Sequence, residues 1–251
     1  MKPPILGSEL VIACLNREGA AFIQETYKFI PELVVCGKTP GGDYHDENVL
    51  EHMIGAMDAA SGYHPSLQLA ALFHDVGKPP TAEVREGRLT FHGHEVAGAK
   101  IVRDLFPRLG LNELITQEVS HLVQHHMYRF APETKEKAFR HWLLRVGPNW
   151  YDLLLLRLAD RRGNRAKRDR SAWTSQMNGL VLRVNKVLDE NPVVFDTDLA
   201  ITREEIKELA GDKEDEVVSA LVGLVNNEPE KNNNSWLKEY TMRVYATSSN
   251  D

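Results

Sequence analysis

Apolar residues recur along most of this chain at the three- and four-residue spacing of amphipathic helices. In residues 46–60, for example, Asp46 is the expected N-cap, Val49, Met53 and Met57 fall on one stripe, and Gly62 closes the segment. The same spacing predicts further helices over residues 8–30 (as one helix or two), 93–106, 111–127, 135–146, 148–162, 171–189 and 215–225. Residues 79–93 are expected to form a loop or a short hairpin. The pattern therefore predicts an all-α fold.

One of these helices is apolar on nearly every side. Between Leu67 and Phe73 the one polar residue is Gln68, which predicts a helix buried on most of its surface. His74 follows and should point inward, with Asp75 directly after it and a break at Gly77. A buried carboxylate beside a buried imidazole is costly unless a cation meets them. A metal ion is the simplest partner, and a hydrogen-bonded core pair is the alternative.

The other histidines and one more aspartate supply candidate partners. All ten histidines lie between His45 and His141. His126 shares the apolar stripe of 111–127, whereas His125 sits one position round the helix, and Asp160 shares a face with apolar residues of 148–162. Two inward carboxylates repel each other unless cations intervene. Histidine and aspartate together suit Mn, Fe, Co, Ni or Zn.

Composition limits the class of protein. With 251 residues, 42% hydrophobic and 26% charged, the chain is expected to be a soluble globular protein of one domain, or of one domain and an appendage. It shows neither a span of about 20 apolar residues nor a signal peptide at its start, so we expect no membrane association. Cys14 and Cys36 are expected to be free thiols in a reducing cytoplasm, with a single bridge as the alternative.

The distribution of charge predicts two parts. The net charge of −6 argues against a protein that coats nucleic acid, yet residues 157–170 are strongly basic and residues 196–251 are acidic. Asn191-Pro192 marks the change. We therefore expect a domain over 1–190, with its core at about 46–165, and a helical C-terminal extension over 191–251.

The order of the polar residues, His52, His74-Asp75, His94, His126 and Asp160, resembles the HD-domain superfamily of metal-dependent phosphohydrolases. The surrounding motifs are similar to the HD region and C-terminal tail of bacterial tRNA nucleotidyltransferases. They are Val49-Leu-Glu-His52, Leu69-Ala-Ala-Leu-Phe-His-Asp-Val-Gly-Lys-Pro79, Phe91-His-Gly-His94-Glu95, Leu158-Ala-Asp160 and Asp198-Leu-Ala-Ile201. The nucleotidyltransferase head of that family, with its Gly-Ser loop and paired catalytic aspartates, is not found in this sequence, so CCA addition is not expected.

The resemblance implies an HD-domain helical bundle that binds one or two divalent ions, from among Mn, Ni, Co, Mg, Fe and Zn. The implied metal ligands are His52, His74, Asp75 and Asp160, with His94, His126 and His125 as candidates for a second ion or for the phosphate. Lys78, His94 and His126 would be catalytic, with Lys78 and His94 stabilising the transition state. Arg161, Arg162 and Arg165 would bind substrate phosphate.

The implied reaction is hydrolysis of 2′,3′-cyclic phosphates, 2′-phosphates or phosphomonoesters on nucleotides or RNA 3′ ends, with metal-activated water attacking phosphorus in line. Two alternatives remain open. One is a deoxynucleotide phosphatase or triphosphohydrolase, and the other is a non-catalytic RNA-binding module built on the HD fold.

Overall fold

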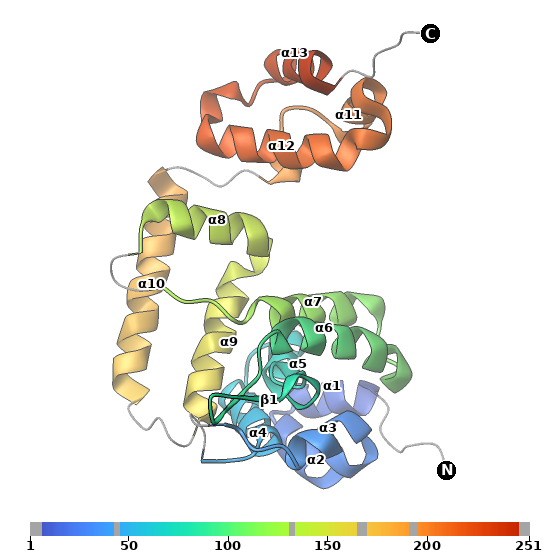
Figure 1. Ribbon diagram of the computed structural model, residues 1–251, viewed down its shortest axis with the longest axis vertical. Helices are drawn as coiled ribbons and strands as arrows, with labels where there is room; N and C mark the ends of the chain where they lie inside the picture. The colour runs from blue at the N-terminus through green and yellow to red at the C-terminus, as the bar shows by residue number, and fades with distance from the viewer. Residues whose placement is uncertain (1–6, 43–45, 131–133, 165–169, 191–194, 246–251) are drawn as a thin grey trace. The chain divides into compact units, whose positions relative to one another are not determined.

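The computed structural model describes residues 7–42, 46–130, 134–164, 170–190 and 195–245, and these ranges are predominantly helical (Figure 1). The all-α prediction is confirmed. The chain forms two compact units, one of residues 1–132 and 148–182 and the other of residues 133–147 and 183–251. The helices of the first unit are α1 Gly7–Leu15, α2 Gly19–Thr26, α3 Pro31–Gly37, α4 Val49–Ala59, α5 Pro65–Phe73, α6 His94–Leu105, α7 Glu113–His125 and α9 Trp150–Gly163.

Helix α5 is the centre of the first unit. Every residue from Ser66 to Phe73 is buried, and α4, α7 and α9 all pack against the helix. Its polar residue Gln68 satisfies its amide by donating to the carbonyl oxygens of Cys14 (3.1 Å) and Tyr63 (2.7 Å). At the other end, the Phe73 ring meets Phe106 edge to face, with centroids 5.2 Å apart. The buried helix is where the apolar run predicts it.

Local chemistry determines where the neighbouring helices begin. The N-cap of α4 is Asn48 and not Asp46. The Asn48 Oδ1 accepts the backbone N–H of Glu51 at 2.9 Å in a capping box. Helix α3, which the apolar pattern does not separate from its surroundings, begins at Pro31. The region 8–30, expected to form one helix or two, is divided into α1 and α2, with the second beginning at Gly19.

The link between α5 and α6 contains the short hairpin that the sequence allowed. Strands β1 Glu83–Arg85 and β2 Arg88–Thr90 pair antiparallel in the register Val84 to Leu89. Glu86 and Gly87 between them both have positive φ, 51° and 77°, which is the backbone of a tight two-residue hairpin turn. The hairpin returns the chain to the core, where α6 starts at His94.

Helices α4 and α9 of the first unit cross at two glycines, Gly55 and Gly163. A Cβ on Gly163 of α9 would lie 2.4 Å from the backbone nitrogen of Ala56 in α4, and a Cβ on Gly55 would lie 2.9 Å from the Gly163 carbonyl oxygen. Because these glycines lack a Cβ, the two backbones can touch. His52 and Asp160 are each three residues from these glycines, so the crossing places them near each other.

The second unit contains α8 Glu136–Val146, the end of α10 Arg170–Glu190, and the C-terminal helices α11 Arg203–Ala210, α12 Glu214–Asn227 and α13 Asn234–Tyr245. Within it, the Arg140 guanidinium of α8 donates to the Asn226 carbonyl oxygen at 2.9 Å. Thr202 and Glu205 form a capping box at the start of α11. The C-terminal helices enclose an apolar core of Leu199, Ile201, Ile206, Ala210, Val217, Val218, Leu221, Val225 and Leu237.

The second unit therefore begins before residue 190, because α8 and the end of α10 group with the C-terminal helices. The predicted boundary, Asn191-Pro192, lies outside the described residues, so the separate extension over 191–251 stays a prediction. Both cysteines, Cys14 and Cys36, are free and buried, and burial raises the pKa of each thiol to about 12. In the described ranges, no helix combines the length and the apolar character needed to cross a membrane.

We expect Gly163→Ala to destabilise the first unit by about 1–3 kcal/mol, because the new methyl group meets backbone atoms that cannot rotate away. Gly179→Ala is the matched control. Gly179 also lies inside a helix, α10, but nothing lies within 4 Å of the added Cβ, so alanine should stabilise by about 0.4–1 kcal/mol. Urea unfolding of both variants measures the difference. Equal midpoints would show that the α4–α9 crossing is not tight.

Candidate metal centre

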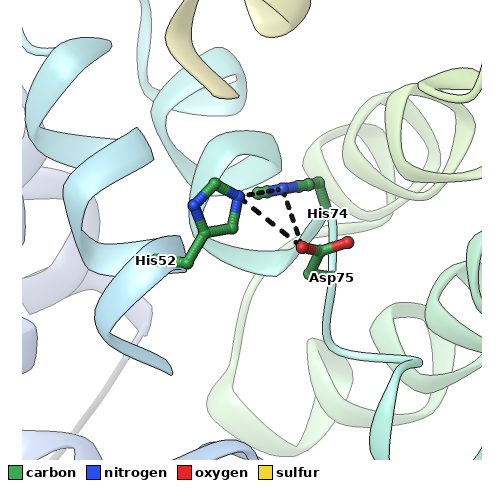
Figure 2. A group of neighbouring side chains, drawn as sticks. All are labelled: His52, His74 and Asp75. Carbon is green, nitrogen blue, oxygen red and sulfur yellow. Dashed lines mark hydrogen bonds and ion pairs between the residues drawn. The ribbon is translucent and has the colours of Figure 1, made fainter. Parts of the chain in front are cut away.

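Six polar side chains of the first unit converge around the end of α5. His52 comes from α4, His74 and Asp75 follow α5, His94 begins α6, His126 follows α7, and Asp160 lies on α9. The four histidines and Asp75 are all at least 94% buried. Figure 2 shows the His52 and His74 rings and the Asp75 carboxylate turned toward one another. Five segments far apart in the sequence thus deliver polar atoms to one small volume.

The first group of ligand atoms surrounds His52 Nε2. That nitrogen lies 3.1 Å from His74 Nε2, 3.1 Å from Asp160 Oδ1 and 3.6 Å from Asp75 Oδ2. His74 Nε2 is 3.3 Å from the same Asp75 oxygen. His52, His74 and Asp75 thus offer ligand atoms within the reach of a single ion, and Asp160 Oδ1 lies 3.9 Å from His74 Nε2 beside them.

The second group uses the other oxygen of Asp75. Asp75 Oδ1 lies 3.3 Å from His94 Nε2 and 4.0 Å from His126 Nε2, and the two nitrogens are 3.2 Å apart. Asp75 therefore faces one histidine pair with each oxygen. This arrangement can hold two ions, with Asp75 as the ligand they share.

The outer nitrogens of these rings determine which atoms face inward. Nδ1 lies 2.8 Å from the Ala71 carbonyl oxygen in His74, 2.8 Å from that of Phe91 in His94, and 2.7 Å from that of Val123 in His126. A carbonyl oxygen can only accept, so each Nδ1 carries a hydrogen, and in the neutral, metal-binding form of each ring the Nε2 lone pair points inward.

The inward nitrogens then meet each other unfavourably. Lone pairs facing across 3.1 Å and 3.2 Å repel unless a proton or a cation lies between them. A metal ion would satisfy both nitrogens of a pair and the adjacent carboxylate oxygen, and carbonyl bonds to the outer nitrogen are the usual support of metal-binding histidines. The donor set therefore fits a divalent transition metal.

The electrostatics of the centre favour charged aspartates. Burial by itself raises the pKa of Asp75, but the positive charges of His74 and Lys78 outweigh it and hold the pKa of Asp75 well below its usual range. The pKa of Asp160 is lowered in the same way, against the effect of burial, by His52 and His74. Both carboxylates are therefore available as anionic ligands at neutral pH.

The histidines differ from one another. Burial lowers the pKa of His52, yet its contacts with Asp160 and Glu47 raise it to about 9. Burial and the charge of His74 lower the pKa of His126 to about 3. The His126 imidazole is therefore neutral at any physiological pH, which is the form that binds a metal.

Lys78 lies inside the centre. Its Nζ is 2.7 Å from Asp75 Oδ2 and 5.3 Å from the centroid of the Phe91 ring, and the residue is 8% exposed. The sequence placed Lys78 in a loop near the site and assigned it to the transition state. The structure adds that its resting partner is the central carboxylate.

The remaining predicted residues are arranged around α7 and α9. His125 is the last residue of α7, and its ring lies beside that of His121, with centroids 4.6 Å apart, so the structure does not bring it to either ligand group. Arg161 and Arg162 are half-buried on α9, and Arg162 lies 3.4 Å from the Thr174 hydroxyl. Arg165 lies outside the described residues.

Two residues near the centre were missed from the sequence. Arg157 lies one helical turn before Asp160, with its guanidinium 3.7 Å from Asp160 Oδ2, and its i, i+3 spacing could have indicated the contact. Glu47 lies 3.4 Å from His52 through its Oε1 and is buried. An acidic residue is normally expected at the surface, so no sequence pattern would have identified Glu47 as buried.

Residues 49–165 match the HD domain family, and this region of the chain is an HD domain. It contains all six residues of the centre. Over the same part of the chain the sequence is similar to two tRNA nucleotidyltransferases. The CC-adding tRNA nucleotidyltransferase of Thermus thermophilus is 35% identical over 151 residues, which are 58% of this chain and 34% of that protein.

The A-adding tRNA nucleotidyltransferase of Deinococcus radiodurans is 32% identical over 163 residues, which are 62% of this chain and 37% of that protein. The matched segments thus span about a third of the length of each relative. The expected resemblance to the HD region of this family is confirmed.

We expect Asp75→Asn to abolish the response of the fold to metal. The wild-type melting temperature should rise when Mn replaces a chelator, because a ligand that binds only the folded state stabilises it. The asparagine variant should show no rise, because both ligand groups lose their shared anion. It should also lose about 3–5 kcal/mol without metal, since the buried Lys78 loses its counter-charge.

The double variant Asp75→Asn/Lys78→Met separates these two effects. It should recover most of the stability that the single variant loses, because no buried charge is left without a partner, and it should still ignore Mn. Melting curves of the three proteins, each with Mn and with chelator, make the comparison. A wild type indifferent to every divalent ion would contradict a metal centre.

Proposed function

We propose that this protein is a metal-dependent phosphohydrolase that acts on phosphoesters of nucleotides or RNA ends. One observation carries the proposal, namely the two pairs of facing Nε2 atoms on either side of the Asp75 carboxylate. Such a cluster is costly in a structural core and suits a pair of divalent ions. Divalent ions held close together supply activated water and neutralise the charge of a phosphate undergoing displacement.

The residues of the chain have distinct tasks in this proposal. His52, His74, Asp75 and Asp160 would hold one ion, and Asp75, His94 and His126 would hold the other. Lys78 can exchange its contact with Asp75 for one with a phosphate oxygen, because its ammonium is attached to a flexible stem. It would then stabilise the charge that develops on the equatorial oxygens.

The surroundings of Asp160 favour a substrate with several phosphates or a phosphate backbone. Arg157 and Arg161 lie on the same helix within one turn of Asp160. Burial lowers the pKa of Arg161, and the nearby charges of Arg157 and Arg129 lower it further, while Asp160 acts in the opposite direction. Crowded cations are relieved by an anion, and a phosphate meets guanidinium groups with bidentate geometry.

The relatives support the RNA-end part of the proposal. Both are named for additions to tRNA, so a 3′ end of RNA is the expected class of polymer substrate. The proposal concerns hydrolysis at the HD centre, with 2′,3′-cyclic phosphates and 2′-phosphates as the bonds to be cleaved.

A substrate panel tests the proposal. We expect turnover of 2′,3′-cyclic nucleotides or 2′-nucleotides with Mn, Co, Ni or Mg, and none with chelator. Nucleoside mono- and triphosphates, in ribo and deoxy forms, complete the panel. Phosphate release and product chromatography are the measurements.

Asp75→Asn, purified in parallel, controls for contaminating phosphatases, because it should be inactive with every metal. Cleavage of deoxynucleoside phosphates alone would favour the deoxynucleotide phosphatase or triphosphohydrolase. Inertness toward the whole panel, together with salt-sensitive RNA binding, would contradict hydrolysis and favour a binding module.

A further inference from the structure

Glu47 is a buried acidic side chain two residues before the start of α4. It is 4% exposed, and its Oε1 lies 3.4 Å from His52 Nδ1, on the side of the ring opposite the ligand cluster. Removing a carboxylate from water is costly, so a buried one needs a favourable interaction. The contact with His52 meets that need.

The start of α4 is held by other groups. Asn48 and Glu51 form the capping box, and Asn48 also pairs with Pro40 in an isolated antiparallel bridge. Val49 N–H donates to the Thr39 carbonyl oxygen at 3.0 Å. The local backbone thus has its own hydrogen bonds, and the Glu47 side chain is not the helix cap.

His52 differs from the other three histidines of the centre. His74, His94 and His126 each bring Nδ1 to within 2.8 Å of a backbone carbonyl oxygen, whereas the Nδ1 of His52 faces the Glu47 carboxylate at 3.4 Å. Glu95 Oε2 lies 3.6 Å from His94 Nδ1, farther than the carbonyl partner of that nitrogen at 2.8 Å. A carboxylate accepts more strongly than a neutral carbonyl and makes the ring a more basic ligand. Glu47, His52 and the ligand cluster lie in that order, which is the arrangement of carboxylate, histidine and metal.

We propose that Glu47 is a positioning residue, which keeps the hydrogen of His52 on Nδ1 and thereby aims the Nε2 lone pair at the ion held with His74, Asp75 and Asp160. The inference rests on the metal centre of the proposed function. It adds that one of the two ions depends on an anion outside the ligand set, while the ion of His94 and His126 does not.

Glu47→Gln tests the inference because it keeps the size of the side chain. An amide can donate as well as accept, so glutamine can hold the opposite tautomer of His52, whose Nε2 carries the hydrogen and cannot bind metal. Glu51→Gln is the matched control. It makes the same change on the exposed side of the same segment and removes the same charge.

Calorimetric titration with Mn measures the effect. We expect two bound equivalents in the wild type and in Glu51→Gln. In Glu47→Gln one equivalent should bind about 10- to 100-fold more weakly and the other should be unchanged. A melting curve with chelator should show that this variant is still folded.

Spectra of ¹⁵N-labelled histidine in the zinc-loaded wild type give an independent readout that needs no variant. The His52 Nδ1–H proton should lie further downfield than those of His74, His94 and His126, because its bond to a carboxylate is charge-assisted. A His52 signal like the other three, or equal Mn affinities in Glu47→Gln and the wild type, would overturn the inference. A wild type that binds Mn as expected but hydrolyses no phosphoester would overturn the proposed function alone.

Discussion

The organisation of the HD domain depends on one buried carboxylate, that of Asp75. Each of its oxygens faces a pair of imidazole nitrogens, so a single side chain must contact two separate groups of histidines. The ligand residues of α4 and α9, and those of α6 and α7, must therefore all lie within a few ångströms of the end of α5. A shift of any of these helices would leave a buried anion or a buried imidazole without a partner, and such groups are expensive.

Glycines make this approach possible. The α4–α9 contact takes place at Gly55 and Gly163, as described above. A second contact of this kind joins the turn after Asp75 to α6, where a Cβ on Gly77 would lie 2.0 Å from the His94 carbonyl oxygen and 2.5 Å from the Gly98 nitrogen. The ligands from α4, α6 and α9 therefore owe their positions to places where the backbone itself is the packing surface. Glycine loses more conformational entropy on folding than other residues do, and the close backbone packing at these crossings offsets that loss.

Much of this could be predicted from the sequence, because helix periodicity is a local property. We could predict from apolar neighbours on the same helix that α5 is buried and that the side chains of His74 and Asp160 point inward. The same reasoning separated His126 from His125, which lie one residue apart but point in different directions.

What the sequence could not provide were distances between segments. Neither the role of Asp75 in joining two histidine pairs nor the contact of Glu47 with His52 has any pattern within its own element. The start of α4 was misplaced by two residues, since Asp46 and Asn48 are both good capping residues and only the hydrogen bond to Glu51 distinguishes them. The second unit gave a similar difficulty, because α8 lies far in sequence from the C-terminal helices with which it groups.

The contact between Lys78 and Asp75 bears on how the protein reaches its native state. Many small metal sites fold only when the ion arrives, because their ligands repel one another until then. Here the chain carries its own ammonium group, that of Lys78, 2.7 Å from the buried Asp75 carboxylate. The polypeptide can therefore neutralise Asp75 and complete this core before any ion binds, so folding and metal loading are separate steps.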